Sequence, residues 1–456
     1  MASGRVVITG QGWVTPLGAD VGSVWSKLMA ASCAIAPIRR WDASTFATNF
    51  AAEAPAFELF DFLDRAAARH PGAGLGARFA LAAAAQAWVQ AGLGSHDGSS
   101  RHPGVDPERV WIYLGSGEGE VDTMPMAATN IAAWDADARQ VNTRRWAEVG
   151  LERMTLVREL EQEPHVVLTH LGEAFGCRGP AFNCMTACAA STQSVGEATH
   201  LIRRGDADVM LAGGSHSMIH PLGMTGFIRL TAMSTRRDDP KTASRPFSRS
   251  RDGFVMGEGA GILVLEDLEH ALRRGAKPLA EIVGYGASAD AFRITDIQPD
   301  GKGAQAAMRM ALRHAGIDPR EADALGRPPV QYISAHGTGT QENDAIETRA
   351  VKGVFGEQAP RIPFSSVKSM MGHLIQAAGA VELITCVQAI RTGWVPPTIN
   401  LHDADPECDL DYVPNEARDM TDFWGPGAGG VEVAMSNGFG FGGQNNTVVV
   451  RKYREG

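Results

Sequence analysis

Short β-branched runs and helix-like segments alternate along the first half of the chain. Residues 5–12 (RVVITGQG) predict a strand, and residues 80–94 (ALAAAAQAWVQAGLG) predict an Ala-rich helix closed by Gly92. The alternation continues with predicted strands at 110–117, 209–214 and 262–267 and predicted helices at 188–205 and 269–276. Such a pattern indicates a layered α/β protein.

The same order begins again near residue 279. The pattern predicts, in turn, a strand at 280–291, a helix at 303–316, a strand at 330–340, a helix at 342–356 and a last strand at 447–453. We therefore expect two similar α/β halves, residues 1–275 and residues 276–456, although the sequence shows no residue-level repeat. The segment 121–164 departs from the alternation, because it is polar, helical in propensity and poor in strand signals. We expect it on the surface or at a subunit interface.

The composition is that of a globular protein. The chain has 456 residues, of which 44% are apolar and 21% are charged, enough for one large domain or two smaller ones. A net charge of −10 argues against non-specific nucleic-acid binding as the main function.

Two further features bear on the compartment. No run approaches the roughly 18 consecutive apolar residues that cross a bilayer, and the start MASGRVVITGQG lacks the apolar stretch of a signal peptide. We therefore expect a cytoplasmic protein that does not bind membranes. The six cysteines form no CxxC framework and are expected to be reduced, so any special cysteine is special by its reactivity.

Cys188 is the first candidate for chemistry. In NCMTACAAS it directly precedes an Ala-rich helical run, so its sulfur is expected at a helix N-terminus, where unpaired amides and the helix dipole lower a thiol's pKa. Taken alone, however, a free cysteine is more often a small buried hydrophobe than a nucleophile.

Two histidines are further candidates. In SAHGTGTQENDAIE, His336 stands at the tip of a predicted strand, where open α/β sheets place ligands. In SSVKSMMGHLIQAAGAVELI, Lys368 lies in a loop, His373 lies near a helix start, and Glu382 can reach back to the lysine. Each signal is weak alone, but their combination in Gly- and Ala-rich surroundings indicates a site.

A glycine-rich stretch near the C-terminus invites a different interpretation. In SNGFGFGGQNN, Gly438, Gly440 and Gly443 satisfy GxGxxG, but a strand rather than a helix follows, which argues against a dinucleotide site. We expect instead a flexible loop that carries Phe439 and Phe441 at the mouth of an active site.

Metal catalysis is the remaining alternative, with Cys188, His336 and His373 as conceivable zinc ligands. No HExxH or paired CxxC accompanies them. We expect neither a metal nor an organic cofactor.

In this order, these segments resemble the β-ketoacyl-acyl carrier protein synthases, most closely the type II elongating enzymes of bacterial fatty acid synthesis. The resemblance runs from RVVITGQGWVTPLG through STRRDDPKTASRPFSRSRDGFVMGEGAGILVLEDLEHALRRGAK to GFGFGGQNN, nearly the whole chain. It implies the thiolase fold, two similar α/β halves in a five-layered αβαβα arrangement, and a homodimer. The nucleophilic cysteine is implied to lie in the first half and both catalytic histidines in the second.

The resemblance also implies a reaction, a decarboxylative Claisen condensation in fatty acid, specialised polyketide or secondary lipid biosynthesis. Cys188 accepts an acyl chain from a carrier protein. Neutral His336 and His373 donate N–H groups to the charge that develops when a malonyl carrier loses carbon dioxide. The backbone N–H groups of Cys188 and Phe441 match the family's oxyanion hole.

Other positions match the family in two groups. The first supports the histidines, and it consists of Lys368 with its expected charged network, Glu382, Asp344 and Glu347. The second contacts the substrate, and it consists of Thr338 and Thr340 on the pantetheine arm, the gating Phe441, and Phe227 in the acyl pocket.

Two departures from the family concern the acyl pocket. Glu118, in LGSGEGEVD, occupies a position that is typically apolar and faces the acyl chain. A buried, unpaired carboxylate is costly, so either Glu118 points away and pairs with a base, or the pocket takes a shorter, polar or unusual acyl group, which we favour. The segment 121–164 is longer than its counterpart and remodels the same wall, which indicates a specialised pathway.

The expected partners are acyl and malonyl carrier proteins, which are acidic, so docking is expected at basic residues such as Arg65, Arg69 and Arg229. Two alternatives remain. The first is a non-catalytic, chain-length-type partner subunit of a heterodimer, against which the retained Cys188 argues. The second is a decarboxylase or hydrolase on the same fold, whose signature, a lost nucleophile, is absent.

Overall fold

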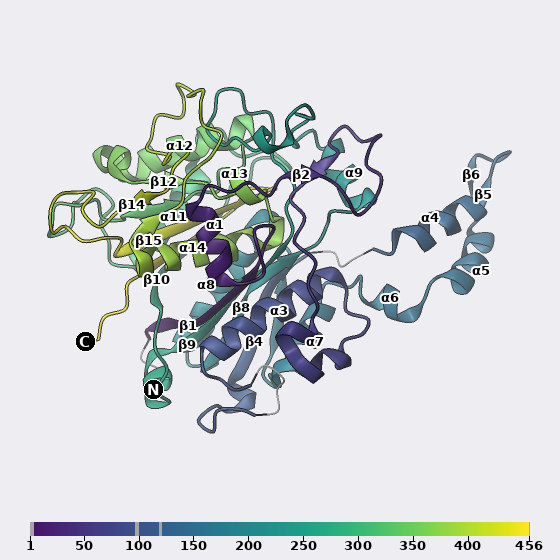
Figure 1. Ribbon diagram of the computed structural model, residues 1–456, viewed down its shortest axis with the longest axis horizontal. Coiled ribbons are helices and arrows are strands. Elements are labelled where there is room, and N and C mark those ends of the chain that lie inside the picture. Colours follow the sequence, from purple (N-terminus) through teal and green to yellow (C-terminus); the bar gives the residue numbers. More distant parts are fainter. Residues whose placement is uncertain (1–3, 96–99, 118–120, 456) are drawn as a thin grey trace.

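The structure, a computed structural model, describes residues 4–95, 100–117 and 121–455. Its main feature is a mixed sheet of ten strands (Figure 1). From one edge to the other the strands are β12 (Phe364–Ser365), β11 (Tyr332–Ser334), β15 (Val433–Gly440), β16 (Gln444–Arg451), β10 (Ala280–Ala289), β1 (Val6–Val14), β9 (Gly259–Asp267), β8 (Val209–His216), β4 (Val110–Ser116) and β7 (Ala181–Cys184). The strands that carry the site are parallel: β4 pairs with β7 and β8, and β11 pairs with β12 and β15.

The sheet has two halves of five strands. The strands β1, β9, β8, β4 and β7 all precede residue 268, and the other five all follow residue 279. The halves join where Val6–Ile8 of β1 pair with Ala280–Ile282 of β10. The two similar halves are therefore confirmed, whereas the exact boundary between 275 and 276 stays a prediction.

Helices cover and separate the two halves. On one outer face α3 (Leu75–Gln90) packs on β1 and β9, and on the other α11 (Lys302–His314) packs on β10 and β16, beside α12 (Gln341–Phe355). Between the halves lie α8 (Ala190–Arg203), against β4 and β8, and α14 (Ala378–Thr392), against β15. This arrangement confirms the expected αβαβα layers.

Small residues allow the inner layers to approach closely. The helix α3 is Ala-rich, and a Cβ at Gly10 of β1 would stand 2.0 Å from the carbonyl oxygen of Ala87. The two central helices, α8 and α14, pack equally closely against each other, because a Cβ at Gly379 of α14 would stand 1.9 Å from Thr192 Oγ1 of α8. Their N-terminal ends therefore meet, and both lead into the loops that carry chemistry.

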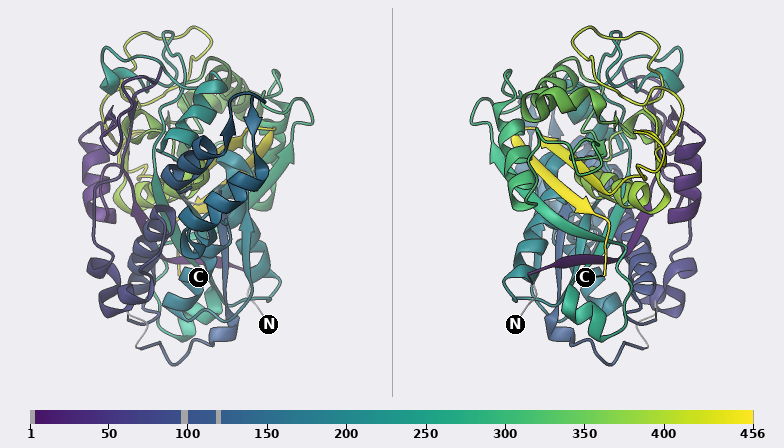
Figure 2. Two further views of the ribbon diagram at one scale, coloured as in Figure 1. Left: turned by 90° about the vertical axis from the view of Figure 1, so that its right-hand side faces the viewer. Right: turned by 90° about the vertical axis from the view of Figure 1, so that its left-hand side faces the viewer.

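Residues 123–160, which we call the arm, extend away from the body (Figure 1), and in the left view of Figure 2 they lie in front of it. The arm contains α4 (Thr123–Ala132), the hairpin of β5 (Trp134–Asp135) and β6 (Gln140–Val141), α5 (Thr143–Arg153) and α6 (Leu156–Leu160), and it returns to α7 (Val166–Phe175) on the body. It exposes large apolar side chains, among them Met124, Ile131, Trp134, Leu151 and Leu156. Its role at a subunit interface stays a prediction.

Shorter elements complete the described fold. They are α1 (Val21–Met29), β2 (Ala36–Pro37), β3 (Phe50–Ala51), α2 (Phe60–Leu63), α9 (Pro221–Arg229), α10 (Leu268–Arg273), α13 (Lys368–Met371), β13 (Trp394–Val395), β14 (Arg418–Asp419) and several 3-10 turns. No helix within the described ranges is both long and apolar enough to span a membrane.

Three expectations about local structure are wrong. Lys368, which was expected in a loop, begins the short helix α13. The stretch predicted to be a flexible loop is mostly a hairpin, in which β15 ends at Gly440, residues 441–443 turn, and β16 follows. Its small and polar residues carry little strand propensity, and pairing with β11 and β16 makes it a strand. The strand predicted at 330–340 is shorter, because β11 covers Tyr332–Ser334 and a loop begins at Ala335.

Candidate active site

Cys188 lies in a turn at the end of β7. The strand ends at Cys184, and the 3-10 helix η3 (Ala187–Ala189) leads directly into α8. Ala187 has a φ of +47°, a left-handed conformation that costs a non-glycine residue about 1 kcal/mol or more and that marks functional turns. Cys188 itself is 3% exposed, with its sulfur at the start of the helical segment as predicted.

The electrostatic setting of the thiol differs from the sequence expectation. Burial raises the pKa of Cys188 to about 11, and Lys368 and the backbone N–H groups of Phe441 and of Cys188 itself lower it only in part. The expected low pKa is therefore wrong, because removal from water outweighs the helix terminus. Hydrogen bonds from these two amides nevertheless match the proposed oxyanion hole.

This pKa predicts how alkylation of Cys188 depends on pH. We expect its rate with iodoacetamide to rise about tenfold per pH unit from pH 7 to pH 9, because the thiolate fraction grows by that factor below the pKa. Peptide mass spectrometry would follow each cysteine separately. A plateau near pH 7 would show instead that the site stabilises the thiolate.

His336 follows β11 and is held through its backbone. Its N–H and that of Gly337 donate to the two carboxylate oxygens of Glu347, at 2.9 and 2.8 Å. Its carbonyl oxygen accepts a hydrogen bond of 2.6 Å from Lys368 Nζ. These bonds fix the backbone from which the imidazole projects, while Nδ1 of the ring has no partner among the described residues.

His373 is held in one tautomer. Its backbone N–H donates to Val255 O at 2.7 Å, and its Nδ1 accepts a hydrogen bond of 3.2 Å from the N–H of Ile375. A neutral ring whose Nδ1 accepts must carry its proton on Nε2. Nε2 has no partner among the described residues and is free to donate to a substrate.

The structure brings Cys188, His336 and His373 together. One ligand atom of each lies within 4.8 Å of the others, and all three side chains are buried. The two imidazole rings stand 5.5 Å apart, centroid to centroid, at 84°. Burial, and then the charge of Lys368, hold the pKa of both histidines well below the usual value, so both are neutral.

The charged residues around the histidines form two groups, where the sequence analysis expected one. Lys368 forms a buried ion pair with Glu382 of α14. Asp344 and Glu347 instead accept backbone N–H groups, Glu347 from residues 336 and 337 and Asp344 from Phe247 and Gly339. Glu347 and Lys368 therefore hold opposite sides of the His336 backbone, and the supporting role of Asp344 and Glu347 stays a prediction.

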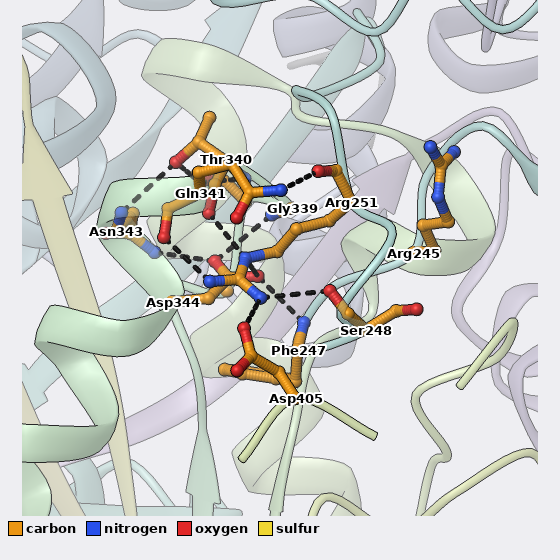
Figure 3. A network of polar contacts seen from close by, with 12 residues as sticks. Arg245, Phe247, Ser248, Arg251, Gly339, Thr340, Gln341, Asn343, Asp344 and Asp405 are labelled. Carbon is orange, nitrogen blue, oxygen red and sulfur yellow. Dashed lines mark hydrogen bonds and ion pairs between the residues drawn. The ribbon is translucent and has the colours of Figure 1, made fainter. Parts of the chain in front are cut away.

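Arg251 is a residue that the sequence analysis missed. Its buried guanidinium donates to Ser248 O, Thr340 O and Gln341 O at 2.7 to 2.9 Å and pairs with Asp405 (Figure 3). It also lies 3.7 Å from Asp344. Arg251 therefore clamps the loop between His336 and α12, and no local pattern distinguishes it from the other arginines of SRPFSRSR.

We expect Arg251→Met to lower the free energy of unfolding by about 3–5 kcal/mol, because it leaves the fully buried Asp344 without a cation. Urea unfolding followed by tryptophan fluorescence measures this. Arg245→Met is the matched control, since Arg245 pairs with Asp252, whose side chain is 34% exposed. Equal losses in both variants would contradict the importance of burial at Asp344.

A cavity of about 320 Å³ opens onto the three residues. Its lining includes Cys188, Phe254, His336, Thr338, Thr340, His373, Phe439 and Phe441. The hydroxyl groups of Thr338 and Thr340 lie 3.0 Å apart, and both can form hydrogen bonds with the amides of a bound substrate chain. Phe254, which the sequence analysis did not single out, stands edge-on to His373 at 5.4 Å.

Two further residues, Phe227 and Glu118, were predicted to lie in the acyl pocket. Phe227 of α9 packs in the apolar group around Cys188, with its ring 5.9 Å from that of Phe254, but it does not line the cavity. Glu118 lies outside the residues that the structure describes.

Of the basic residues predicted to dock a carrier protein, Arg229 ends α9 beside Leu230, which lines the cavity. Arg69 is paired with Glu173 at 3.1 Å, so it is less available.

The arrangement of Cys188, His336 and His373 does not fit a zinc site. A histidine that binds metal through Nε2 carries its proton on Nδ1 and donates it to a neighbouring acceptor. At His373, Nδ1 instead faces the N–H of Ile375, so a proton there would oppose a second donor. The arrangement favours a histidine that donates from Nε2.

Comparison with known families matches residues 3–271 to the N-terminal domain of β-ketoacyl synthases and residues 279–402 to their C-terminal domain. Two relatives named 3-oxoacyl-[acyl-carrier-protein] synthase 2, from Coxiella burnetii and Synechocystis, are each 39% identical over 452 residues, covering 99% of this chain and 99% and 98% of theirs.

Solved structures that resemble this chain belong to the same family. A β-ketoacyl synthase from Burkholderia phymatum is 33% identical, with a TM-score of 0.83 and 100% coverage of both chains. The ishigamide ketosynthase/chain length factor is 32% identical, with a TM-score of 0.81 and 99% coverage of both.

Proposed function

Because this chain belongs to the β-ketoacyl synthase family, we propose that Cys188, His336 and His373 perform its condensation in the roles described below. The protein is a condensing enzyme like 3-oxoacyl-acyl carrier protein synthase 2, an acyltransferase. The observation that supports these residue roles is the meeting of one buried thiol with two neutral imidazoles around one cavity.

The first step is acyl transfer to Cys188. The sulfur attacks the thioester carbonyl of an acyl carrier, a new carbon–sulfur bond forms, and the carrier thiol leaves with the proton that Cys188 loses. The tetrahedral oxyanion sits between the N–H groups of Cys188 and Phe441, which already point at the sulfur. Because the pKa of the free thiol is high, the thiol is protonated before the substrate binds. We expect it to ionise during the step, with the two N–H groups stabilising the negative charge.

The second step forms the carbon nucleophile. A malonyl thioester loses carbon dioxide, and the electron pair of the broken carbon–carbon bond moves toward the thioester oxygen. Nε2–H of His373 and an N–H of His336 donate to that oxygen, and both rings are neutral because their pKa values lie well below the usual value. The resulting enolate attacks the acyl carbon on Cys188, the carbon–sulfur bond breaks, and the 3-oxoacyl carrier is released. The sulfur leaves as a thiolate and takes a proton from water, which restores the thiol for the next cycle.

Lys368 and Glu382 position His336 without touching the substrate. The lysine holds the carbonyl oxygen of His336, and Glu382 keeps the lysine in place. Thr338 and Thr340 bind the pantetheine arm, and Phe441 gates the pocket. Phe227 and Glu118 shape the acyl pocket, which stays a prediction for both.

The carrier proteins are the proposed partners, and we place the protein in the cytoplasm as a homodimer. The arm, with its exposed apolar residues, is the proposed interface. One similar structure is a ketosynthase with a chain length factor. A heterodimer with a related subunit is therefore the second arrangement, but a complete set of Cys188, His336 and His373 favours the catalytic partner.

Intact-mass measurement tests this function in two stages. Incubation with a panel of acyl carrier proteins should add the mass of one acyl group to the enzyme. Subsequent malonyl carrier protein should remove that mass and yield a 3-oxoacyl carrier longer by two carbons, with carbon dioxide released. No mass gain from any acyl carrier would support the partner-subunit role instead.

A further inference from the structure

A second polar cluster lies behind the nucleophile and plays no part in the reaction described above. His216, the last residue of β8, is 4% exposed, and Gln376 is 7% exposed. The Nδ1 of His216 and the Oε1 of Gln376 are 2.5 Å apart. Two buried polar side chains in a region that otherwise surrounds Cys188 with apolar groups require an explanation.

The position of Gln376 links this pair to the active site. Gln376 lies in the 3-10 helix η6 (Ile375–Ala377), which contacts the nucleophile turn η3 on one side and the ends of β4 and β8 on the other. Ile375 and Met256 belong to the apolar group that contains Cys188, and Met256 Sδ lies 3.3 Å from His216 Nε2. Met256 and Ile375 therefore connect the apolar group around Cys188 to the pair.

Beyond the pair the structure leaves little room. A cavity of about 30 Å³ lies at the carboxyl ends of β4 and β8, lined by Ser116, Gly117, Ser215, His216 and Ser217 with Glu161 and Glu163 from the root of the arm. That volume is close to that of one water molecule. The Gln376 amide also fills the space over Gly117, where a Cβ would stand 2.1 Å from Nε2. The lining is mixed, because Ala77, Pro164 and Val167 complete it, and a cavity of this volume does not hold a long saturated chain.

The pair offers both an acceptor and a donor. Burial lowers the pKa of His216 to about 3, so the ring is neutral. With Gln376 Oε1 as the acceptor, the single proton lies on Nδ1, and Nε2 is left facing a thioether sulfur that cannot donate. His216 Nε2 can therefore accept from a hydroxyl group, and the amide NH₂ of Gln376 can donate to a keto group.

We propose that His216 and Gln376 form the polar end wall of the acyl pocket and that the acyl group on Cys188 is short and carries a keto or hydroxyl oxygen that this pair binds. This inference rests on the proposed acylation of Cys188. Substrates of this chemistry are the products of earlier condensations that were not fully reduced, so the reaction that supplies them leaves an oxygen on the chain.

The test compares carrier-protein thioesters of one short chain length in saturated, keto and hydroxy forms, with the oxygen placed on each carbon beyond the thioester in turn. The rate of mass gain on Cys188 is measured for the wild type, Gln376→Leu and His216→Leu. We expect the best oxygenated form to acylate the wild type roughly tenfold faster than the saturated form, since an unmet buried donor or acceptor disfavours the latter. Gln376→Leu should reverse this order.

Gln388→Leu is the matched control, because it removes an equally buried amide from α14, away from η6, and should keep the wild-type order. A wild type that prefers the saturated chain overturns the inference without any variant and leaves the proposed function intact. An oxygen preference that survives in both folded variants at His216 and Gln376 overturns the assignment to this pair. If no thioester adds mass, the proposed function itself fails.

Discussion

Cys188→Ala is expected to add no acyl mass with any carrier and to lower the condensation rate by at least roughly 10³-fold, since the reaction loses its covalent intermediate. The alanine fits the buried turn without strain, because Cys188 is 3% exposed and alanine is smaller. Intact mass spectrometry and assay of the 3-oxoacyl product measure the two effects together.

Cys184→Ala is the matched control for this prediction. Cys184 ends β7 four residues earlier, and its Sγ contacts the carbonyl oxygen of Ala190, so it lies near Cys188 but does not line the cavity. It should keep both acylation and condensation. Acyl mass on Cys188→Ala would show that another residue is the nucleophile.

The sequence carried enough information to predict the fold and the place of Cys188 between a strand and a helix, whereas its role as nucleophile stays a prediction. Cys188 stands between a strand and an Ala-rich helix, and both signals are local, so the position of its sulfur followed from neighbouring residues. The strand and helix alternation likewise predicted two halves. The αβαβα order of layers came from the family resemblance, because packing of α8 against α14 depends on residues nearly two hundred positions apart.

What escaped the sequence depends on burial and on distant partners. The high pKa of Cys188 follows from its removal from water by segments across the chain, which outweighs the local helix terminus. Arg251 acquires its role from Asp344 and Asp405, which are distant in sequence. Gln376 lies inside a segment already singled out, but it gains meaning only when β8 brings His216 to it.

His336→Ala and His373→Ala are each expected to lower decarboxylation of malonyl carrier protein by roughly 10²–10³-fold, while acyl transfer to Cys188 changes little. The expected difference follows from the proposed roles: Nε2–H of His373, which is left free because Nδ1 accepts from Ile375, and the ring of His336 would donate to the malonyl oxygen, whereas the amides of Cys188 and Phe441 would serve the acyl step. Carbon dioxide release and acyl mass, measured in parallel, separate the two steps.

A conservative variant and a control complete the case for the histidines. His373→Asn keeps an N–H donor and should recover part of the decarboxylation, whereas an exposed histidine, His314 of α11, should be replaceable by alanine without effect on either step. Because both rings are neutral, lowering the pH from 7.5 to 6.5 should not slow decarboxylation by the wild type through their protonation. Equal loss of acylation and decarboxylation in the alanine variants would contradict this division, because donors that act only on the malonyl oxygen have no reason to slow the transfer of an acyl group to sulfur.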